Sequence, residues 1–270
     1  MSLSLPSVFD LPEAPADFRP RPAAGLRVAI HGVTKTFPVD RRGQTLFQLA
    51  RRLASRADPV DRFTALRDVT FDVHSGDRIG VIGDNGAGKT TLLKTVAGLY
   101  APDSGSVEVY GSLTLLSGLG IGMIEDLTVA ENIALYGAIY GVDPRTLRDV
   151  QNDILEWAEL DEFANAKLKR LSTGMKARLA FSTTRHVNAD VHLLDEALTA
   201  GDRRFQLKCE QVFDDYVVQG KTFVVATHDH AFVRRVCTHA VWLHKSRQVA
   251  FGDPDDLVAR YLDSANRPLM

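Results

Sequence analysis

The hydrophobic positions along this chain follow two periods, one close to two residues and one between three and four. The shorter period, or a short apolar run, predicts strands at residues 26–30, 69–73, 78–82, 107–110, 191–194, 222–226, 240–243 and 248–251. The longer period predicts helices at residues 44–56, 89–97, 176–186, 204–217 and 254–262, with a longer helical pattern over 129–168. Because strands and helices alternate, we expect an α/β core with a largely parallel sheet, and a helix-rich block near 119–187 inserted between its halves.

The composition is ordinary for a globular protein and speaks against several classes. The chain has 270 residues and a formal net charge of -2, so no global basic field points to nucleic acid. No apolar run is long enough to predict a membrane span, and the first residues lack the pattern of a secretory leader. The prolines within residues 1–25 predict a flexible N-terminal tail, with docking to a partner as the alternative. Cys209 and Cys237 are expected to be reduced and to pack as small apolar side chains.

A glycine-rich segment after the predicted strand 78–82 has the spacing of a phosphate-binding loop, G-x-x-x-x-G-K-T. Glycines let the backbone curl so that its N–H groups point at phosphate oxygens, and the helix that follows adds the positive end of its dipole. We expect Lys89 to reach the β- and γ-phosphates and Thr90 to ligate Mg²⁺. The residues predicted to bind ATP here are Gly83, Asp84, Asn85, Gly86, Ala87, Gly88, Lys89, Thr90 and Thr91.

Three segments downstream place polar groups at the ends of predicted elements. An apolar strand ends in Asp195-Glu196, where Asp195 can hold Mg²⁺ through water and Glu196 stands where an attacking water would sit. Ser172 precedes a predicted helix, and on its own it could be a simple N-cap. His228 ends another strand, where a lone histidine is more often structural, and with His230 it lacks the further ligands of a metal site.

Taken in this order, the segments resemble the nucleotide-binding subunit of ABC ATPases over about residues 26–263. The resemblance implies a P-loop NTPase of the ABC cassette type, with a RecA-like core and mostly parallel sheet, an antiparallel β subdomain and an inserted α-helical subdomain. It identifies Leu171–Met175 as the signature motif, with Thr173 where the family usually has glycine. It identifies Phe37 as the aromatic that stacks on adenine, with a core role as the alternative. The residues that it adds to the ATP site are Phe37, Ser172, Thr173, Gly174 and Asp202, the last in the D-loop.

The resemblance also implies an active site shared between two chains. One phosphate loop covers one side of the triphosphate, and in the family the signature motif of a second subunit closes the other side. The chain has one copy of each, so we expect a homodimer, or a heterodimer with a similar cassette, that sandwiches ATP. Glu196 would orient and deprotonate the attacking water, and His228 would hold that water and the γ-phosphate in line. With Lys89 these residues form the predicted catalytic set, and ATP and Mg²⁺ are the expected cofactors.

Finer features resemble the ATPases that export capsular polysaccharide, O-antigen or teichoic acid. These features are an insertion at 38–64, Met175 where the signature commonly has glutamine, and a segment 197–202 without the usual proline. They imply a subunit that powers movement of a lipid-linked polysaccharide across the cytoplasmic membrane, bound to its cytoplasmic (inner) face through a polytopic transmembrane permease, with no nucleic-acid partner. The ATPase of a drug, lipid or nutrient transporter is one alternative. An ATP-gated regulatory module that scarcely hydrolyses ATP is another.

One departure from the family pattern concerns the magnesium site. Most ABC ATPases have a glutamine before the segment that corresponds to 126–132, whereas residues 116–122 here are rich in glycine and contain none. Either Ser117 or a water would then complete the Mg²⁺ shell. The glycines fit a contact with the permease or a simple loop. The basic segment 44–56 fits a surface for the membrane partner or a solvated cover of a sheet edge, and we favour the second.

Overall fold

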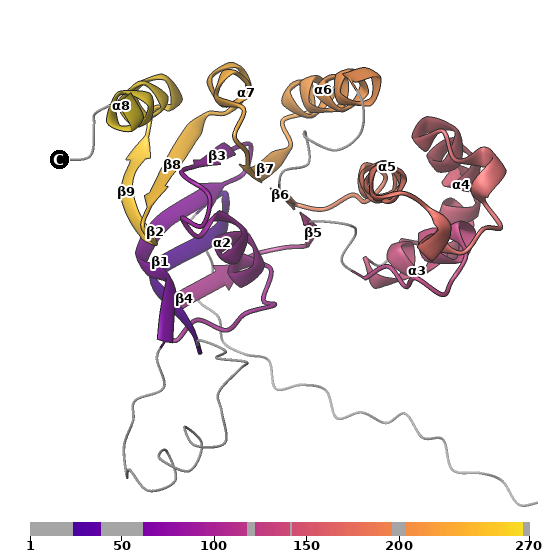
Figure 1. Ribbon diagram of the computed structural model, residues 1–270, viewed down its shortest axis with the longest axis horizontal. Helices are drawn as coiled ribbons and strands as arrows, with labels where there is room; N and C mark the ends of the chain where they lie inside the picture. Colours follow the sequence, from indigo (N-terminus) through magenta and orange to yellow (C-terminus); the bar gives the residue numbers. More distant parts are fainter. Residues whose placement is uncertain (1–23, 39–61, 118–121, 141, 196–202, 267–270) are drawn as a thin grey trace, which may run out of the picture.

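The structure is a computed structural model that describes residues 24–38, 62–117, 122–140, 142–195 and 203–266 (Figure 1). Within these residues, nine strands form one sheet in the order β4-β1-β2-β9-β8-β3-β7-β6-β5. The strands are β1 (Leu26–Pro38), β2 (Arg62–His74), β3 (Arg78–Ile82), β4 (Ser104–Val109), β5 (Leu113–Ser117), β6 (Val191–Asp195), β7 (Thr222–Ala226), β8 (His239–His244) and β9 (Arg247–Gly252).

The sheet has a parallel part and an antiparallel part. Strands β8, β3, β7, β6 and β5 are parallel neighbours, as expected for strands connected through helices. Strand β1 pairs antiparallel with both β2 and β4, and β9 pairs antiparallel with β8. A parallel pairing of Arg67 in β2 with Arg247 in β9 joins the group β4-β1-β2 to the rest of the sheet. The prediction of a mostly parallel sheet with an antiparallel portion is therefore confirmed.

The helices cover both faces of the sheet and form a separate group at one end (Figure 1). Their bounds are α2 (Lys89–Val96), α3 (Val129–Ile139), α4 (Pro144–Ala158), α5 (Thr173–Thr184), α6 (Arg203–Val218), α7 (His230–Val236) and α8 (Pro254–Asn266), with 3-10 turns η1 (Asp161–Phe163) and η2 (Leu168–Arg170). Helices α3, α4 and α5 lie together beyond β5 and share their own apolar core. In the described part of the chain, none of the helices is long and apolar enough to cross a bilayer.

Strand β7 shows how the apolar pattern builds the two layers. All five of its residues are buried. Phe223 and Val225 pack in the cluster that contains residues of α6, α7 and α8, whereas Val224 and Ala226 pack in the cluster that contains α2. Side chains alternate between the faces of a strand, so a strand covered on both faces is apolar throughout. This burial fixes the carboxyl ends of the parallel strands, where the predicted site residues lie.

The structure differs from the sequence prediction at several elements. Strand β5 and helix α7 were not predicted, and the helical pattern over 129–168 is divided into α3, α4 and two short turns. Strands β1 and β2 are longer than expected, and they pair as far as Pro38 with Arg62, which lie within the predicted insertion. The rest of that insertion, including the predicted helix 44–56, lies outside the described residues, as does nearly all of the predicted tail. The predicted domain limits stay predictions.

Candidate nucleotide site

The loop between β3 and α2 needs glycine at two positions because other backbone lies against it. Gly83 and Gly88 have φ angles of 146° and 111°, in the region that side chains disfavour. A Cβ on Gly83 would lie 2.1 Å from the carbonyl oxygen of Leu243, and one on Gly88 would lie 2.4 Å from that of Ala65. The spacing of the glycines therefore lets the loop close tightly between β8 and β2 before α2 begins.

Lys89 is the first residue of α2, and its side chain reaches back into the loop, where its ammonium group bonds to backbone carbonyls. The side chain is buried, and Nζ donates to the carbonyl oxygens of Gly83 at 2.7 Å and Asp84 at 3.1 Å. Nζ also lies 3.4 Å from Nε2 of His228, which follows β7. A cation and the first N–H groups of α2 thus occupy one small region, which suits a polyphosphate.

Asp195 at the end of β6 lies between two hydroxyl groups. Thr90 Oγ1 donates to Oδ1 at 3.1 Å, and Ser117 Oγ donates to Oδ2 at 2.8 Å. A carboxylate beside hydroxyl oxygens is a set that Mg²⁺ prefers. Across the described ranges, no group of three or more His, Cys, Asp and Glu side chains could form a dedicated metal cage. The residues therefore fit an ion held by one carboxylate, hydroxyls and the phosphates of a nucleotide.

Asp84, the second residue of the phosphate loop, is tied to two elements far away in the sequence. Its Oδ1 accepts a hydrogen bond from the Tyr261 hydroxyl of α8 at 3.0 Å, and its Oδ2 lies 3.3 Å from Nδ1 of His244. Burial, followed by the bond to Asp84 and its negative charge, raises the pKa of Tyr261. Sequence reasoning missed this link because no motif relates residues 177 positions apart.

Phe37 lies near the end of β1 and meets a second aromatic ring. The ring centroids of Phe37 and Tyr100 are 5.1 Å apart with an edge-to-face angle of 75°. The Lys35 ammonium lies 5.4 Å from the Phe37 centroid. Phe37 is only partly buried, so it is not a fully enclosed core residue. Its predicted contact with adenine stays a prediction, and Tyr100 is a neighbour that the sequence did not indicate.

The signature segment lies apart from this loop. Ser172 is the N-cap of α5, and its Oγ accepts the N–H of Met175 at 3.2 Å. Ser172 and Thr173 are exposed, and a Cβ added to Gly174 would meet nothing within 4 Å. Figure 1 shows α5 grouped with α3 and α4, away from α2. One chain alone therefore does not bring these residues together with Lys89.

Two predicted residues, Glu196 and Asp202, lie outside the described residues, and their roles stay predictions. The others fall into three groups. The phosphate-loop residues 83–91 lie with Asp195 and His228 at the carboxyl end of the parallel strands, Phe37 lies near the end of β1, and the signature residues begin α5.

Comparison with known proteins places these features in one family. A family model described as ABC transporter matches residues 66–199. The chain is 37% identical over 235 residues to the ABC transporter protein AbcA of Aeromonas salmonicida, a match that covers 87% of this chain and 75% of AbcA. It is 32% identical over 235 residues to the teichoic acids export ATP-binding protein TagH of Bacillus anthracis, covering 87% of this chain and 42% of TagH.

A third relative is the O-antigen export system ATP-binding protein RfbB of Myxococcus xanthus. It is 36% identical over 201 residues, which are 74% of this chain and 46% of RfbB. The chain thus spans about half the length of several curated relatives, from 42% to 61% in three TagH proteins.

Solved structures agree on the fold. A dimeric post-hydrolysis state of an ATP-binding cassette with ADP and Pi has a TM-score of 0.67 at 22% identity, covering 84% of this chain and 98% of that one. An ATP-binding subunit of an ABC transporter has a TM-score of 0.69 at 21% identity, covering 88% and 97%. The predicted cassette fold is confirmed. The extent and identity of the match to AbcA show that the chain belongs to the ABC transporter family.

Proposed function

We propose that this chain is the ATP-hydrolysing subunit of an exporter that moves a lipid-linked polysaccharide across the cytoplasmic membrane. The convergence of Lys89, Thr90 and Asp195 at one end of the sheet is the observation that carries the ATPase part of the proposal. The polysaccharide part is supported by the relatives named for export of teichoic acids and O-antigen.

In the proposed reaction, each group of the chain acts by position and charge. The Lys89 ammonium, which now bonds to loop carbonyls, would turn to the β- and γ-phosphates. Thr90 and Asp195 would hold Mg²⁺, which neutralises charge on the phosphoryl oxygens when bound. Glu196 would accept a proton from the attacking water, and His228 would keep that water in line with the γ-phosphate. Several groups that are individually weak then form one strong site.

The other half of the site would come from a second copy of this chain or from a similar cassette. The exposed start of α5 and the free space around Gly174 leave room for the triphosphate of a nucleotide bound to a partner. The N–H groups at the start of a helix favour an anion. Asp202, in the D-loop, would lie at the same dimer interface.

A membrane permease is the proposed second partner, which would hold the subunit at the cytoplasmic face of the membrane. Two exposed apolar side chains lie near the glycine-rich stretch 116–122: Ile124, just after it, is 50% exposed, and Ile139, at the end of α3, is 56% exposed. A Cβ on Gly122 would lie 3.1 Å from Cδ1 of Ile139, so the backbone lies close to this apolar surface. Such a surface suits a helix of a membrane protein that reaches into the cytoplasm.

Steady-state phosphate release by the purified chain, with ATP binding measured in parallel, tests the ATPase part. Glu196→Gln should abolish turnover and retain ATP binding, because it removes the proposed general base and leaves the phosphate loop intact. Lys89→Ala should lose both, because the phosphates lose their cation. If wild type binds ATP and shows no phosphate release, alone or with a permease, the chain is a nucleotide-gated module. A deletion strain tests export, because it should lose its surface polysaccharide. The wild-type gene should restore the polysaccharide, and the Glu196→Gln variant should not.

A further inference from the structure

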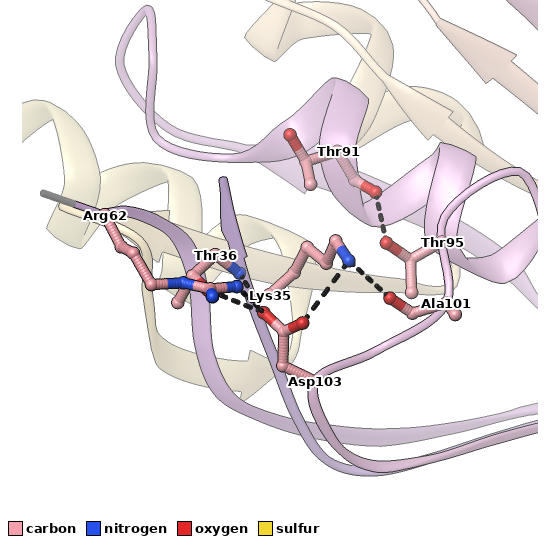
Figure 2. A network of polar contacts seen from close by, with 7 residues as sticks. All are labelled: Lys35, Thr36, Arg62, Thr91, Thr95, Ala101 and Asp103. Atoms are coloured by element: carbon pink, nitrogen blue, oxygen red, sulfur yellow. Dashed lines mark hydrogen bonds and ion pairs between the residues drawn. The ribbon is translucent and has the colours of Figure 1, made fainter. Parts of the chain in front are cut away.

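The carboxylate of Asp103 is held against the end of β1 by two hydrogen bonds from Thr36 (Figure 2). Its Oδ2 accepts from the backbone N–H of Thr36 at 2.6 Å and from the Thr36 hydroxyl at 2.7 Å. The Lys35 ammonium lies 3.5 Å from Oδ1. The two bonds from Thr36, the side-chain one first, and the charges of Lys35 and Arg62 hold the pKa of Asp103 below its usual range. The carboxylate is therefore ionised at neutral pH.

Two more hydrogen bonds belong to this network, one to Thr36 and one from Lys35. Nε of Arg62, the first residue of β2, donates to Thr36 Oγ1 at 2.8 Å. Nζ of Lys35 donates to the carbonyl oxygen of Ala101 at 2.7 Å. Figure 2 shows the side chains of Lys35, Thr36 and Arg62 directed toward Asp103. We call these residues, with Asp103, the Asp103 clamp. A single exposed ion pair contributes little, whereas a carboxylate with several directed donors fixes a geometry.

The clamp connects two parts of the proposed nucleotide site. On one side, the residue after Thr36 is Phe37. On the other side, the segment 97–103 continues from α2, which begins at Lys89. Tyr100 meets the Phe37 ring, and the N–H groups of Leu99 and Tyr100 donate to the carbonyl oxygen of Lys94, at 2.9 and 3.4 Å. The position of Phe37 is thereby tied to the helix that carries the phosphate loop.

We propose that Asp103 is a positioning residue for the base of the bound nucleotide, because it fixes Phe37 at a set distance from the phosphate loop. This inference rests on the proposed role of Phe37 at adenine. A ring already held in place loses less freedom when the base stacks on it, and the saved entropy appears as affinity. The clamp would thus let one chain bind the nucleotide base and the triphosphate at the same time.

A purely structural role for Asp103 makes a different prediction. If the clamp only stabilised β1 and its neighbours, its loss would lower the free energy of unfolding and weaken binding of every ligand alike. A positioning role acts on the base alone. The comparison that separates the two is ATP against inorganic tripolyphosphate, which has the phosphates and no base.

The experiment measures dissociation constants of both ligands for the purified full chain and its variants by calorimetry. Asp103→Ala should weaken ATP binding about 3- to 10-fold, the effect of freeing one ordered side chain, and leave tripolyphosphate affinity unchanged. Phe37→Ala should weaken ATP binding by about 5-fold or more, with the same selectivity. In the double variant the two losses should not multiply, because Asp103 acts through Phe37.

Asp126→Ala is the matched control, since Asp126 is another exposed aspartate paired to a lysine, Lys169 at 2.6 Å, and its pKa is lowered too. It should leave both affinities unchanged. Equal losses for ATP and tripolyphosphate in Asp103→Ala, or independent losses with Phe37→Ala, would overturn the positioning role while the ATPase proposal stands. An unchanged ATP affinity in Phe37→Ala would remove the adenine contact and this inference together. Failure of wild type to bind ATP at all would instead refute the proposed function.

Discussion

Ser117 and Asp195 are paired residues at the ends of the parallel strands β5 and β6, and the serine hydroxyl donates to Asp195 Oδ2 at 2.8 Å. Ser117 is buried, so this hydroxyl has a fixed direction. The bond leaves Asp195 Oδ1 turned toward Thr90. In a family that usually places a glutamine in this region, the serine can serve the metal by orienting the carboxylate rather than by reaching the ion itself.

Removal of this hydroxyl should therefore weaken metal binding. We expect Ser117→Ala to reduce Mn²⁺ affinity by about 10-fold in the presence of a non-hydrolysable ATP analogue, the lower end of effects seen for groups that orient a ligand. Electron paramagnetic resonance of free Mn²⁺ gives the affinity without any turnover. Ser117→Thr, which keeps a hydroxyl, should bind Mn²⁺ nearly as wild type does. Equal affinities for the alanine and threonine variants would show that Asp195 needs no such support.

The bond between Tyr261 and Asp84 should couple helix α8 to the phosphate loop. Tyr261→Phe keeps the ring contacts with Trp242 and His230 and removes only the hydroxyl. We expect the free energy of unfolding, measured in urea, to fall by about 1 kcal/mol, the usual contribution of such a bond. In an Asp84→Ala background the same change should have little further effect. A full additional loss in that background would mean that the hydroxyl acts elsewhere.

The sequence predicted the parts of the site whose chemistry depends on local spacing. The glycines around Lys89, the apolar strand before Asp195 and the cap at Ser172 are each recognisable within a few residues, and the structure has a loop, a strand end and a helix start there. The strand β5 could not be separated from its glycine-rich surroundings, because Leu-Thr-Leu-Leu-Ser is short and lacks alternation. Its burial comes from β6 beside it and from the helices packed on the sheet.

Long-range polar links lay beyond the sequence for a different reason. Asp103 and Thr36 are 67 residues apart, and either one is an ordinary loop or strand residue when considered alone. Only the antiparallel pairing of β1 with β4, which places Thr34 opposite Ser104, brings them within hydrogen-bond distance. Contacts of this kind follow from tertiary structure, and no sequence motif predicts them.

His192 in β6 should make the fold less stable in mild acid. Burial, with a smaller effect of the Lys221 charge, lowers its pKa to about 4. Neither ring nitrogen has a hydrogen-bond partner, and the ring lies 5.1 Å from that of Tyr216. Between about pH 6.5 and 4 the unfolded chain binds a proton that the folded chain does not, so stability rises with pH and is lost as pH falls.

The loss attributable to His192 between pH 7 and pH 5 is about 2 kcal/mol of unfolding free energy. His192→Phe should reduce the difference between urea titrations at the two pH values by that amount. Some difference should remain, because burial, with the charge of Arg185, also lowers the pKa of His186 against the opposing effect of Asp153. An identical pH dependence in His192→Phe and wild type would contradict the lowered pKa.

The proposed sharing of the active site between two chains can be tested by mixing two inactive variants. A Cβ at Gly174 would meet nothing within 4 Å, so we expect Gly174→Arg to fold and to obstruct only the nucleotide held by a partner. Lys89→Ala removes the cation from the phosphate loop of its own chain. In a mixed dimer, one of the two sites combines the intact Lys89 loop of the first variant with the intact signature of the second. Phosphate release should therefore reappear when the two inactive proteins are mixed, and should rise with the concentration of dimers.

The control for this experiment is Gly174→Ala, which adds a single methyl group and should retain activity without mixing. If the mixture stays inactive while both variants are folded and dimerise, each site must be built within one chain.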